Sequence, residues 1–168
     1  MRLFAVFIAA FLPFVAGAQV QRMRDLYYAA GNDAGITAFY NEAKKTTSTD
    51  PVMIAYKGVA IAMYAEVASK VKEKFGYFEE GKILIDQAAS AAPRNAEIAF
   101  LRFSVQSEVP AFLGYRDNIQ NDANIVVASL RGKQIDLTED FWKKALAFMK
   151  KSGKLNSLQL SEINRYLS

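Results

Sequence analysis

The sequence predicts an all-α fold in which about seven helices pack as antiparallel hairpins in one domain. Residues 19–168 contain many helix start and stop signals, and no convincing alternation of apolar and polar residues indicates a strand. Apolar residues recur at helical spacing in this range, often on more than one face of a segment. The chain contains no cysteine, so disulfide bonds are excluded and packing alone must hold the helices together.

Residues 1–18 have the pattern of a secretory signal peptide. Arg2 gives a positive start, residues 3–15 form an apolar run, and Ala16-Gly17-Ala18 fits the small-residue cleavage site. The run is shorter than the ~20 apolar residues that a membrane-crossing helix needs, so we expect no permanent transmembrane anchor. We therefore expect cleavage near Ala18/Gln19, a single helical domain over residues 19–168, and a periplasmic or secreted location in a bacterium.

Capping residues and helix breakers place the expected helix boundaries. Asn32 or Asp33 caps the first helix, and Asp50-Pro51 is a cap followed by proline at the first helical position. Gly76 is expected to end or kink the chain before the next helix. The expected helices cover residues 33–45, 51–71, 77–92, 96–109, 115–131, 138–151 (or from 136) and 157–167, after a short amphipathic segment at residues 22–30.

Residues 50–95 carry small residues that favour close helix packing. The helix at 51–71 has two apolar stripes, which predicts two neighbours, and Gly58 on one stripe allows a close helix–helix approach. This segment resembles a tetratricopeptide-type helical hairpin, although its two glycines lie about eleven residues farther apart than in that family. The residues that carry the resemblance are Gly58, Gly81, Ile85, Ala88, Pro93 and Asn95. With its P-x-F-L-G-Y corner at residues 110–115, the whole mature chain also resembles exported bacterial all-helical proteins, which implies no activity.

The most distinctive side chains lie in residues 95–126, which we expect to form a helix, a proline-marked corner and a second helix. Arg102 lies in an apolar run of the first helix, where an unpaired charge is costly. Its candidate partners are Asp122, Asp117, Glu79 and Glu80. The residues that share a face of the second helix are Tyr115, Asn118, Ile119 and Asp122. Two interpretations stay open: an anion or carboxylate site around Arg102, or a structural role as a buried ion pair or solvent-reaching arginine.

Basic character is concentrated near the C-terminus. From residue 131 onward, eight Lys or Arg stand against four Asp or Glu, whereas residues 19–130 have twelve against thirteen. The helix at 138–151 is expected to place Phe141, Ala145, Phe148 and Met149 on one side, with Trp142 at the edge. The basic surface of the segment at residues 141–154 consists of Lys143, Lys150 and Lys154. This surface fits an anionic membrane or an acidic partner, and it equally fits an ordinary packing helix with a solvated lysine face.

Catalysis is disfavoured by the residues that the chain lacks. There is no histidine and no cysteine, and no nucleophile elbow, P-loop or dinucleotide fingerprint is present. The acidic pairs Glu79-Glu80 and Glu139-Asp140 are adjacent in sequence, so their side chains diverge on a helix. We expect a protein that is not an enzyme and uses no cofactor or metal; a carboxylate-dependent hydrolase is the remaining catalytic alternative. No nucleic-acid-binding motif appears, so nucleic acid is not an expected partner.

Tyrosines are concentrated in the first part of the mature chain. The five that precede residue 65 are Tyr27, Tyr28, Tyr40, Tyr56 and Tyr64. Such residues line a peptide-binding groove if they face the inside of a curved helical array, and otherwise pack between helices with their hydroxyls in water. The leading functional hypothesis is a module that binds another cell-envelope protein or peptide through this groove and the Arg102 corner, with Tyr56 and Tyr64 among the contacts.

Overall fold

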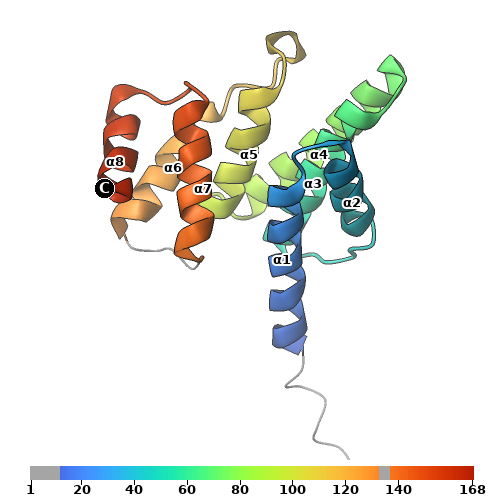
Figure 1. Cartoon of the computed structure of the whole chain (residues 1–168), viewed down its shortest axis with the longest axis horizontal. Coiled ribbons are helices and arrows are strands. Elements are labelled where there is room, and N and C mark those ends of the chain that lie inside the picture. The colour runs from blue at the N-terminus through green and yellow to red at the C-terminus, as the bar shows by residue number, and fades with distance from the viewer. Residues whose placement is uncertain (1–11, 133–136) are drawn as a thin grey trace, which may run out of the picture.

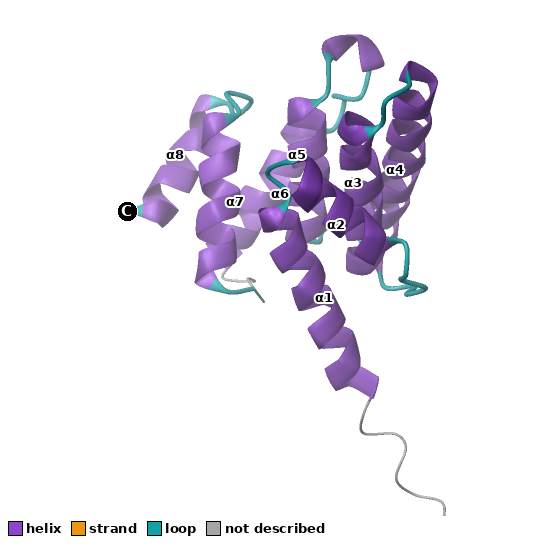
Figure 2. Cartoon of the chain, turned by 45° about the vertical axis from the view of Figure 1, so that its right-hand side comes forward, coloured by secondary structure: helices purple, strands orange, loops and turns teal. Residues whose placement is uncertain are grey.

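The structure is a computed structural model that describes residues 12–132 and 137–168, with side chains from residue 17 onward. Within these ranges it contains eight α-helices, one 3-10 helix (η1) and no strand, so the predicted all-α class is confirmed (Figures 1 and 2). The helices are α1 (Leu12–Ala29), α2 (Asp33–Ala43), α3 (Pro51–Val67), α4 (Val71–Ala91), α5 (Ala96–Glu108), η1 (Ala111–Leu113), α6 (Ile119–Gly132), α7 (Glu139–Lys151) and α8 (Ser157–Leu167).

Most of the predicted caps are found at helix starts. Side-chain oxygens accept hydrogen bonds from backbone N–H groups at the beginnings of α2, α3, α5, α7 and α8, which satisfies donors that a helix N-terminus otherwise leaves open. The capping residues are Asn32, Asp50, Asn95, Thr138 and Asn156, of which Asn156 was not predicted from the sequence. Of the alternative caps, Asp33 is the first residue of α2 instead, and Asp136 lies outside the described residues.

The predicted break at Gly76 is wrong. α4 begins at Val71 and runs through Gly76 without interruption, while α3 already ends at Val67. A glycine inside a helix costs only about 1 kcal/mol relative to alanine, which the rest of a long helix tolerates. The earlier end of α3 is stabilised by Lys74, whose ammonium donates to the carbonyl oxygens of Ala65 and Glu66 at 3.2 and 2.9 Å.

α3 and α4 approach each other most closely at two glycines. A Cβ atom on Gly58 would lie 2.7 Å from the carbonyl oxygen of Gly81, and one on Gly81 would lie 2.5 Å from the carbonyl oxygen of Gly58. Both distances are too short for a side chain, so only glycine fits at either position. The close approach predicted from Gly58 is therefore confirmed, and it extends to both helices of the hairpin.

α5 is the central helix of the fold. It lies between α1–α4 on one side and α6–α8 on the other (Figures 1 and 2), and it contacts α3, α4, α6 and α7. From Glu97 to Gln106 every residue except Arg102 is buried. The prediction that this helix is sandwiched between neighbours is thus confirmed.

The corner after α5 differs from its prediction in one respect. Pro110 is followed by η1, and Gly114 adopts the left-handed conformation (φ 64°) that glycine favours. The next helix, α6, begins at Ile119 and not near Tyr115, because the first helical hydrogen bond runs from the Asp122 N–H to the Asn118 carbonyl oxygen (2.8 Å). Tyr115 is buried in the connection that precedes α6.

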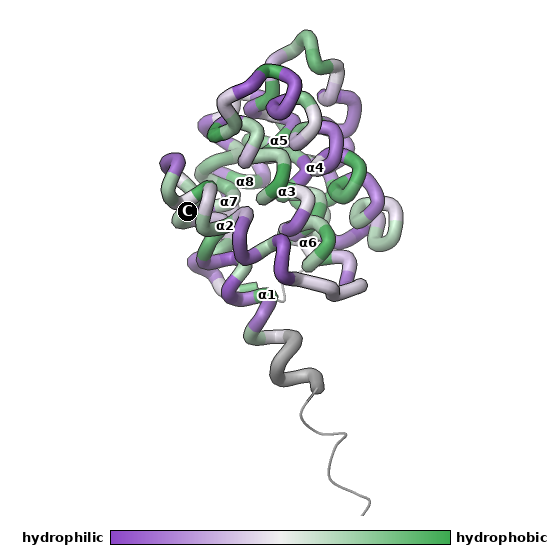
Figure 3. The backbone as a smooth tube through the Cα atoms, turned by 90° about the vertical axis from the view of Figure 1, so that its right-hand side faces the viewer, coloured by the Kyte–Doolittle hydropathy of each residue, from purple (hydrophilic) through white to green (hydrophobic). Residues whose placement is uncertain are grey.

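The C-terminal helices are amphipathic, and hydrophobic and hydrophilic residues alternate along the chain trace (Figure 3). Trp142 was expected at the edge of the apolar face of α7, but only 1 % of its surface is exposed. It packs inside because Leu146, one turn later, is also buried and widens the apolar face. On α8, Ile163 is buried, whereas Leu158 is largely exposed and Tyr166 partly exposed.

Candidate functional site

A large apolar groove lies at one end of the molecule. It lies where the ends of α1, α3 and α5, the start of α4, η1 and α7 meet, and its volume is about 890 Å³. Figure 1 shows the turn between α3 and α4 and the turn after α5 at the same end of the molecule. Its aromatic lining residues are Tyr27, Tyr28, Phe75, Phe78, Phe100, Phe112 and Phe148.

Three large apolar side chains at the groove are unusually exposed. The exposed fractions are 69 % for Val71, 47 % for Phe75 and 79 % for Phe112. Single exposed apolar residues are common, but a contiguous apolar surface over a cavity is typical of a binding site. We therefore define the groove as the candidate functional site.

Two of the tyrosines singled out in the sequence belong to the groove. Tyr28 donates a hydrogen bond from its hydroxyl to the carbonyl oxygen of Phe141 at 3.1 Å, which fixes its ring. Burial raises the pKa of the Tyr27 hydroxyl to about 12, so this group stays neutral at physiological pH. Both rings therefore present uncharged, mainly apolar surface to the groove.

The other predicted groove tyrosines lie elsewhere. Tyr56 is completely buried and donates its hydroxyl proton to Glu97, so it cannot contact a bound peptide. Tyr64 stacks on Tyr40 with ring centroids 3.9 Å apart, and Tyr77 meets both rings edge-on. For Tyr56 the alternative reading, packing between helices, is correct, although its hydroxyl is bonded to protein and not to water.

The Arg102 corner is an ion-pair cluster. Arg102 Nε and Nη2 donate to the two carboxylate oxygens of Asp122 at 2.8 and 2.7 Å, and Nη1 lies 3.5 Å from Asp86. Tyr115 donates to Asp86 at 2.9 Å. Burial raises the pKa of Asp122, and the bidentate bonds from Arg102 oppose that shift. Among the partners proposed from sequence, Asp122 is the one found.

The polar atoms of this cluster are mostly satisfied within the protein. Only 11 % of the Arg102 side chain and none of the Asp122 side chain is exposed, so neither offers a charge to a ligand. Asn118, predicted to share the site, is only partly buried and makes no side-chain hydrogen bond to the cluster among the described residues. The geometry corresponds to the structural interpretation of Arg102. Gln106, also on α5, is fully buried, and its amide atoms have no hydrogen-bond partner among the residues that the structure describes.

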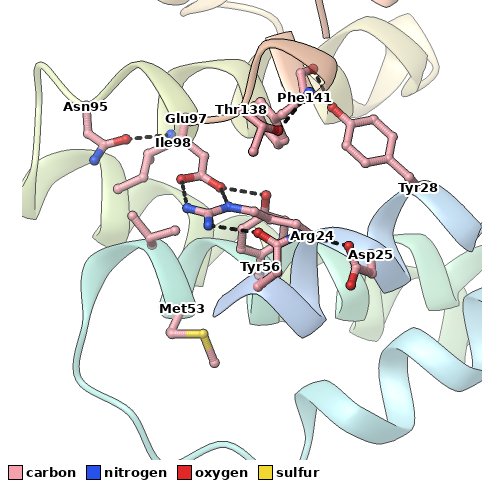
Figure 4. Close-up of polar contacts among 12 residues, drawn as sticks. Arg24, Asp25, Tyr28, Met53, Tyr56, Asn95, Glu97, Ile98, Thr138 and Phe141 are labelled. Carbon is pink, nitrogen blue, oxygen red and sulfur yellow. Dashed lines mark hydrogen bonds and ion pairs between the residues drawn. The ribbon is translucent and has the colours of Figure 1, made fainter. Parts of the chain in front are cut away.

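A second buried cluster was missed by sequence reasoning. Arg24 donates from Nε and Nη2 to the two carboxylate oxygens of Glu97 at 2.7 and 2.8 Å, and Tyr56 donates to the same carboxylate at 2.7 Å (Figure 4). Burial lowers the pKa of Arg24, and the Glu97 hydrogen bonds and charge outweigh this effect, so its pKa is raised overall. In the sequence, Glu97 already has a simpler role as an acidic residue in a first helical turn, so nothing signalled its burial.

Beside Arg24 lies a smaller, polar pocket with a volume of about 340 Å³. Its polar lining residues are Gln21, Arg24, Asp25, Tyr28, Thr138, Asp140 and Lys144. Of these, Lys144 pairs with Asp140 at 2.7 Å and lies over the Tyr28 ring. The pocket therefore lies beside the Arg24–Glu97 cluster, and most charged residues that line the pocket are already paired.

The predicted basic surface is present but partly neutralised. Lys143 is exposed and pairs with Glu139 at 2.7 Å, one turn earlier on α7. Lys150 is exposed in the last turn of α7, and Lys154 follows Gly153 in the turn before α8. Glu139 and Asp140, the acidic pair considered for catalysis, are thus occupied by lysines of the same helix.

Comparison with known proteins adds no relative: no family model, no curated protein and no solved structure matches the chain. Among the residues that the structure describes, no helix combines the length and apolar character that a membrane span requires.

Proposed function

We propose that the chain is a non-catalytic binding module of the bacterial cell envelope, which holds an apolar segment of a protein or peptide in its groove. The observation that carries this proposal is the exposure of Val71, Phe75 and Phe112 around one large apolar cavity. A groove built by helices accepts the apolar face of an amphipathic helix, whose side chains at positions i, i+3, i+4 and i+7 fill the cavity. The hairpins would form a short tetratricopeptide-like array, in which such a surface is the usual binding region.

Export is part of the same proposal, and the packing of α1 supports it. Gly17, Ala18 and Gln19 are exposed, Val20 is the first described side chain that packs against the core, and Met23 is the first that is buried. Cleavage between Ala18 and Gln19 would therefore remove no described core side chain. Mass spectrometry of the protein recovered from the cell-envelope fraction should find an N-terminus at Gln19; a retained residue 1 would contradict export by cleavage.

Peptide binding is tested directly by fluorescence anisotropy. A labelled amphipathic-helix peptide with a continuous leucine face is titrated with the purified protein. We expect saturable binding that weakens about 5- to 30-fold in Phe112→Ser and in Phe75→Ser, because aromatic anchors each contribute about 1–2 kcal/mol at interfaces. Thermal unfolding followed by circular dichroism checks that each variant remains folded.

Ile83→Ser is the matched control. Ile83 is 63 % exposed and lies on α4, the helix that carries Phe75, but it does not line the groove. Its substitution should leave the affinity unchanged. Absence of saturable binding, or equal losses in Phe75→Ser and Ile83→Ser, would contradict the proposal.

Association with an anionic membrane through α7 has less support. Two lysines of α7 form ion pairs with acidic residues of the same helix, which reduces the positive charge available to lipid headgroups. Phe141, Trp142 and Met149, the large apolar residues that would enter a bilayer, are buried in the protein. Binding of the protein to anionic vesicles that weakens as the salt concentration rises would support this alternative.

A further inference from the structure

Helix ends give the groove an uneven electrostatic character. The last turns of α3 and α5 and the residues that follow α1 line it, so the C-terminal ends of three helices lie at one cavity. The C-terminus of a helix carries a partial negative charge, and the effect is strongest within the last turn. Among the α-helices that the structure describes, α4 alone contributes its N-terminal end, at Val71. These helix ends therefore favour a positive charge at the rim of the groove, which we define by its charged residues Glu66, Lys74, Glu108 and Lys144.

Side chains at the rim add to this preference. Two carboxylates, Glu66 and Glu108, line the groove, and neither receives a hydrogen bond or ion pair from the residues that the structure describes. Both lie in the last turn of a helix, where a negative charge is unfavourable for the helix itself. Helix stability therefore does not explain their presence.

The two lysines of the rim are already engaged. Lys74 donates to the carbonyl oxygens of Ala65 and Glu66, at the end of α3. Lys144 pairs with Asp140 at 2.7 Å and lies 5.3 Å from the centroid of the Tyr28 ring. Asp140 neutralises Lys144, whereas the neutral carbonyls at the end of α3 leave Lys74 with its charge. Two carboxylates without an ion pair thus stand against one lysine without an acidic partner among the described residues, and the groove keeps a net negative charge.

We infer that the partner in this groove is a basic amphipathic helix, whose apolar face enters the cavity while lysines or arginines beside that face meet Glu66 and Glu108. This inference rests on the proposed peptide-binding function and names the partner class. The aromatic lining adds to the preference, because ring faces attract cations. A fatty acid or an acidic helix would place its carboxylates beside unpaired carboxylates, and this repulsion disfavours both.

The test compares two labelled peptides that share one leucine face, one with lysine and one with glutamate at the flanking positions. We expect the protein to bind the lysine peptide about 10-fold more tightly at low salt, and the preference to shrink as salt rises. In Glu66→Gln/Glu108→Gln the preference should fall about 5-fold, because each exposed charge pair contributes modestly. The affinity for the glutamate peptide should not fall.

The matched control is Glu79→Gln/Glu80→Gln. It removes the same formal charge from exposed positions of α4 that do not line the groove, so the preference for the lysine peptide should persist. Equal affinity of the parent for both peptides, or a preference that stays undiminished in Glu66→Gln/Glu108→Gln, would overturn the inference while leaving peptide binding intact.

Failure of the proposed function looks different, because then neither peptide binds. Analytical ultracentrifugation at the same protein concentrations measures the oligomeric state. A monomer is expected; self-association that Phe112→Ser abolishes would assign the groove to a second copy of the chain and overturn the inference.

Discussion

α5 takes part in two buried arginine–carboxylate clusters, and it supplies the carboxylate to one and the arginine to the other. At its beginning the helix supplies the acid, Glu97, which binds Arg24 of α1 and Tyr56 of α3. About one and a half turns later it supplies the arginine, Arg102, which binds Asp122 of α6. The Arg24 cluster thus joins α5 to α1 and α3, whereas the Arg102 cluster joins it to α6 and, through Asp86, to α4. Both clusters use a bidentate arginine–carboxylate pair.

The clusters differ in their access to water. Asp122 is fully buried, and only 11 % of the Arg102 side chain is exposed. Arg24 has an exposed side-chain fraction of 19 % and lines the polar pocket between α1 and α7. An arginine beside a polar pocket can turn to solvent when its partner is removed, whereas a fully buried aspartate cannot. The comparison predicts different costs for breaking two similar ion pairs.

Arg102→Ala is expected to have the largest effect. It leaves the Asp122 carboxylate buried without its bidentate partner, and breaking a buried ion pair costs about 3–5 kcal/mol. Urea unfolding at neutral pH measures the loss. A loss under 1 kcal/mol would show that Asp122 finds water or another donor.

The same variant has a characteristic pH dependence. In the parent, burial already raises the pKa of Asp122; without Arg102, the main group that opposes the shift, this pKa rises further. A carboxyl group with a raised folded-state pKa contributes stability that is present below its unfolded pKa and is lost as pH rises through the folded pKa. The deficit of Arg102→Ala should therefore be largest at pH 7 and shrink toward pH 4, and Arg102→Ala/Asp122→Asn should lack this recovery.

Glu97→Ala is expected to cost less, about 2–3 kcal/mol. The variant leaves the Tyr56 hydroxyl buried without an acceptor, but Arg24 can reach the polar pocket beside it. Urea unfolding again gives the loss, with Glu79→Ala as the exposed control that should change stability by less than about 0.5 kcal/mol. A loss equal to that of Arg102→Ala would remove the distinction between the two clusters.

Tyr56→Phe should destabilise the protein by about 1 kcal/mol. Glu97 keeps both hydrogen bonds from Arg24, so only one donor to the carboxylate is lost and the ring still fills its place. Thermal unfolding of parent and variant at one pH resolves this change. An unchanged midpoint would mean that the hydroxyl contributes nothing to the cluster.

Tyr115→Phe is expected to have the smallest effect, about 0.5 kcal/mol. Its hydroxyl donates to Asp86, whose side chain is 38 % exposed, so water can replace the lost donor. The difference between Tyr56→Phe and Tyr115→Phe measures access to water at the two clusters directly. A larger loss in Tyr115→Phe would reverse the comparison.

Sequence reasoning found one cluster and missed the other for a physical reason. Arg102 interrupts an apolar run, so its need for a partner is visible in the sequence. Arg24 lies in a segment of mixed polarity, and Glu97 stands where helices often carry an acid. A buried charge is therefore detectable from sequence when its neighbours along the chain are apolar.

The helices were easier to predict than the groove. Capping residues are local signals, so the starts of α2, α3, α5, α7 and α8 follow from sequence, whereas Gly76 misled because its cost is small within a long helix. The groove draws its lining from helix ends far apart in the sequence. Tyr27 and Tyr28 were among its predicted residues, but only the tertiary packing separates them from the buried Tyr56.

The glycine contact between α3 and α4 also has a consequence for folding kinetics. The two helices are joined by the short turn Ala68-Ser69-Lys70, and their backbones meet at Gly58 and Gly81. Such sequence-local contact has a low loop-closure cost, so we expect the hairpin to form early. Val59 and Phe78, which are buried in the folded chain, then lie on a formed hairpin that the other helices have not yet covered. Refolding yield should consequently decline as protein concentration rises, because these side chains can meet another chain first.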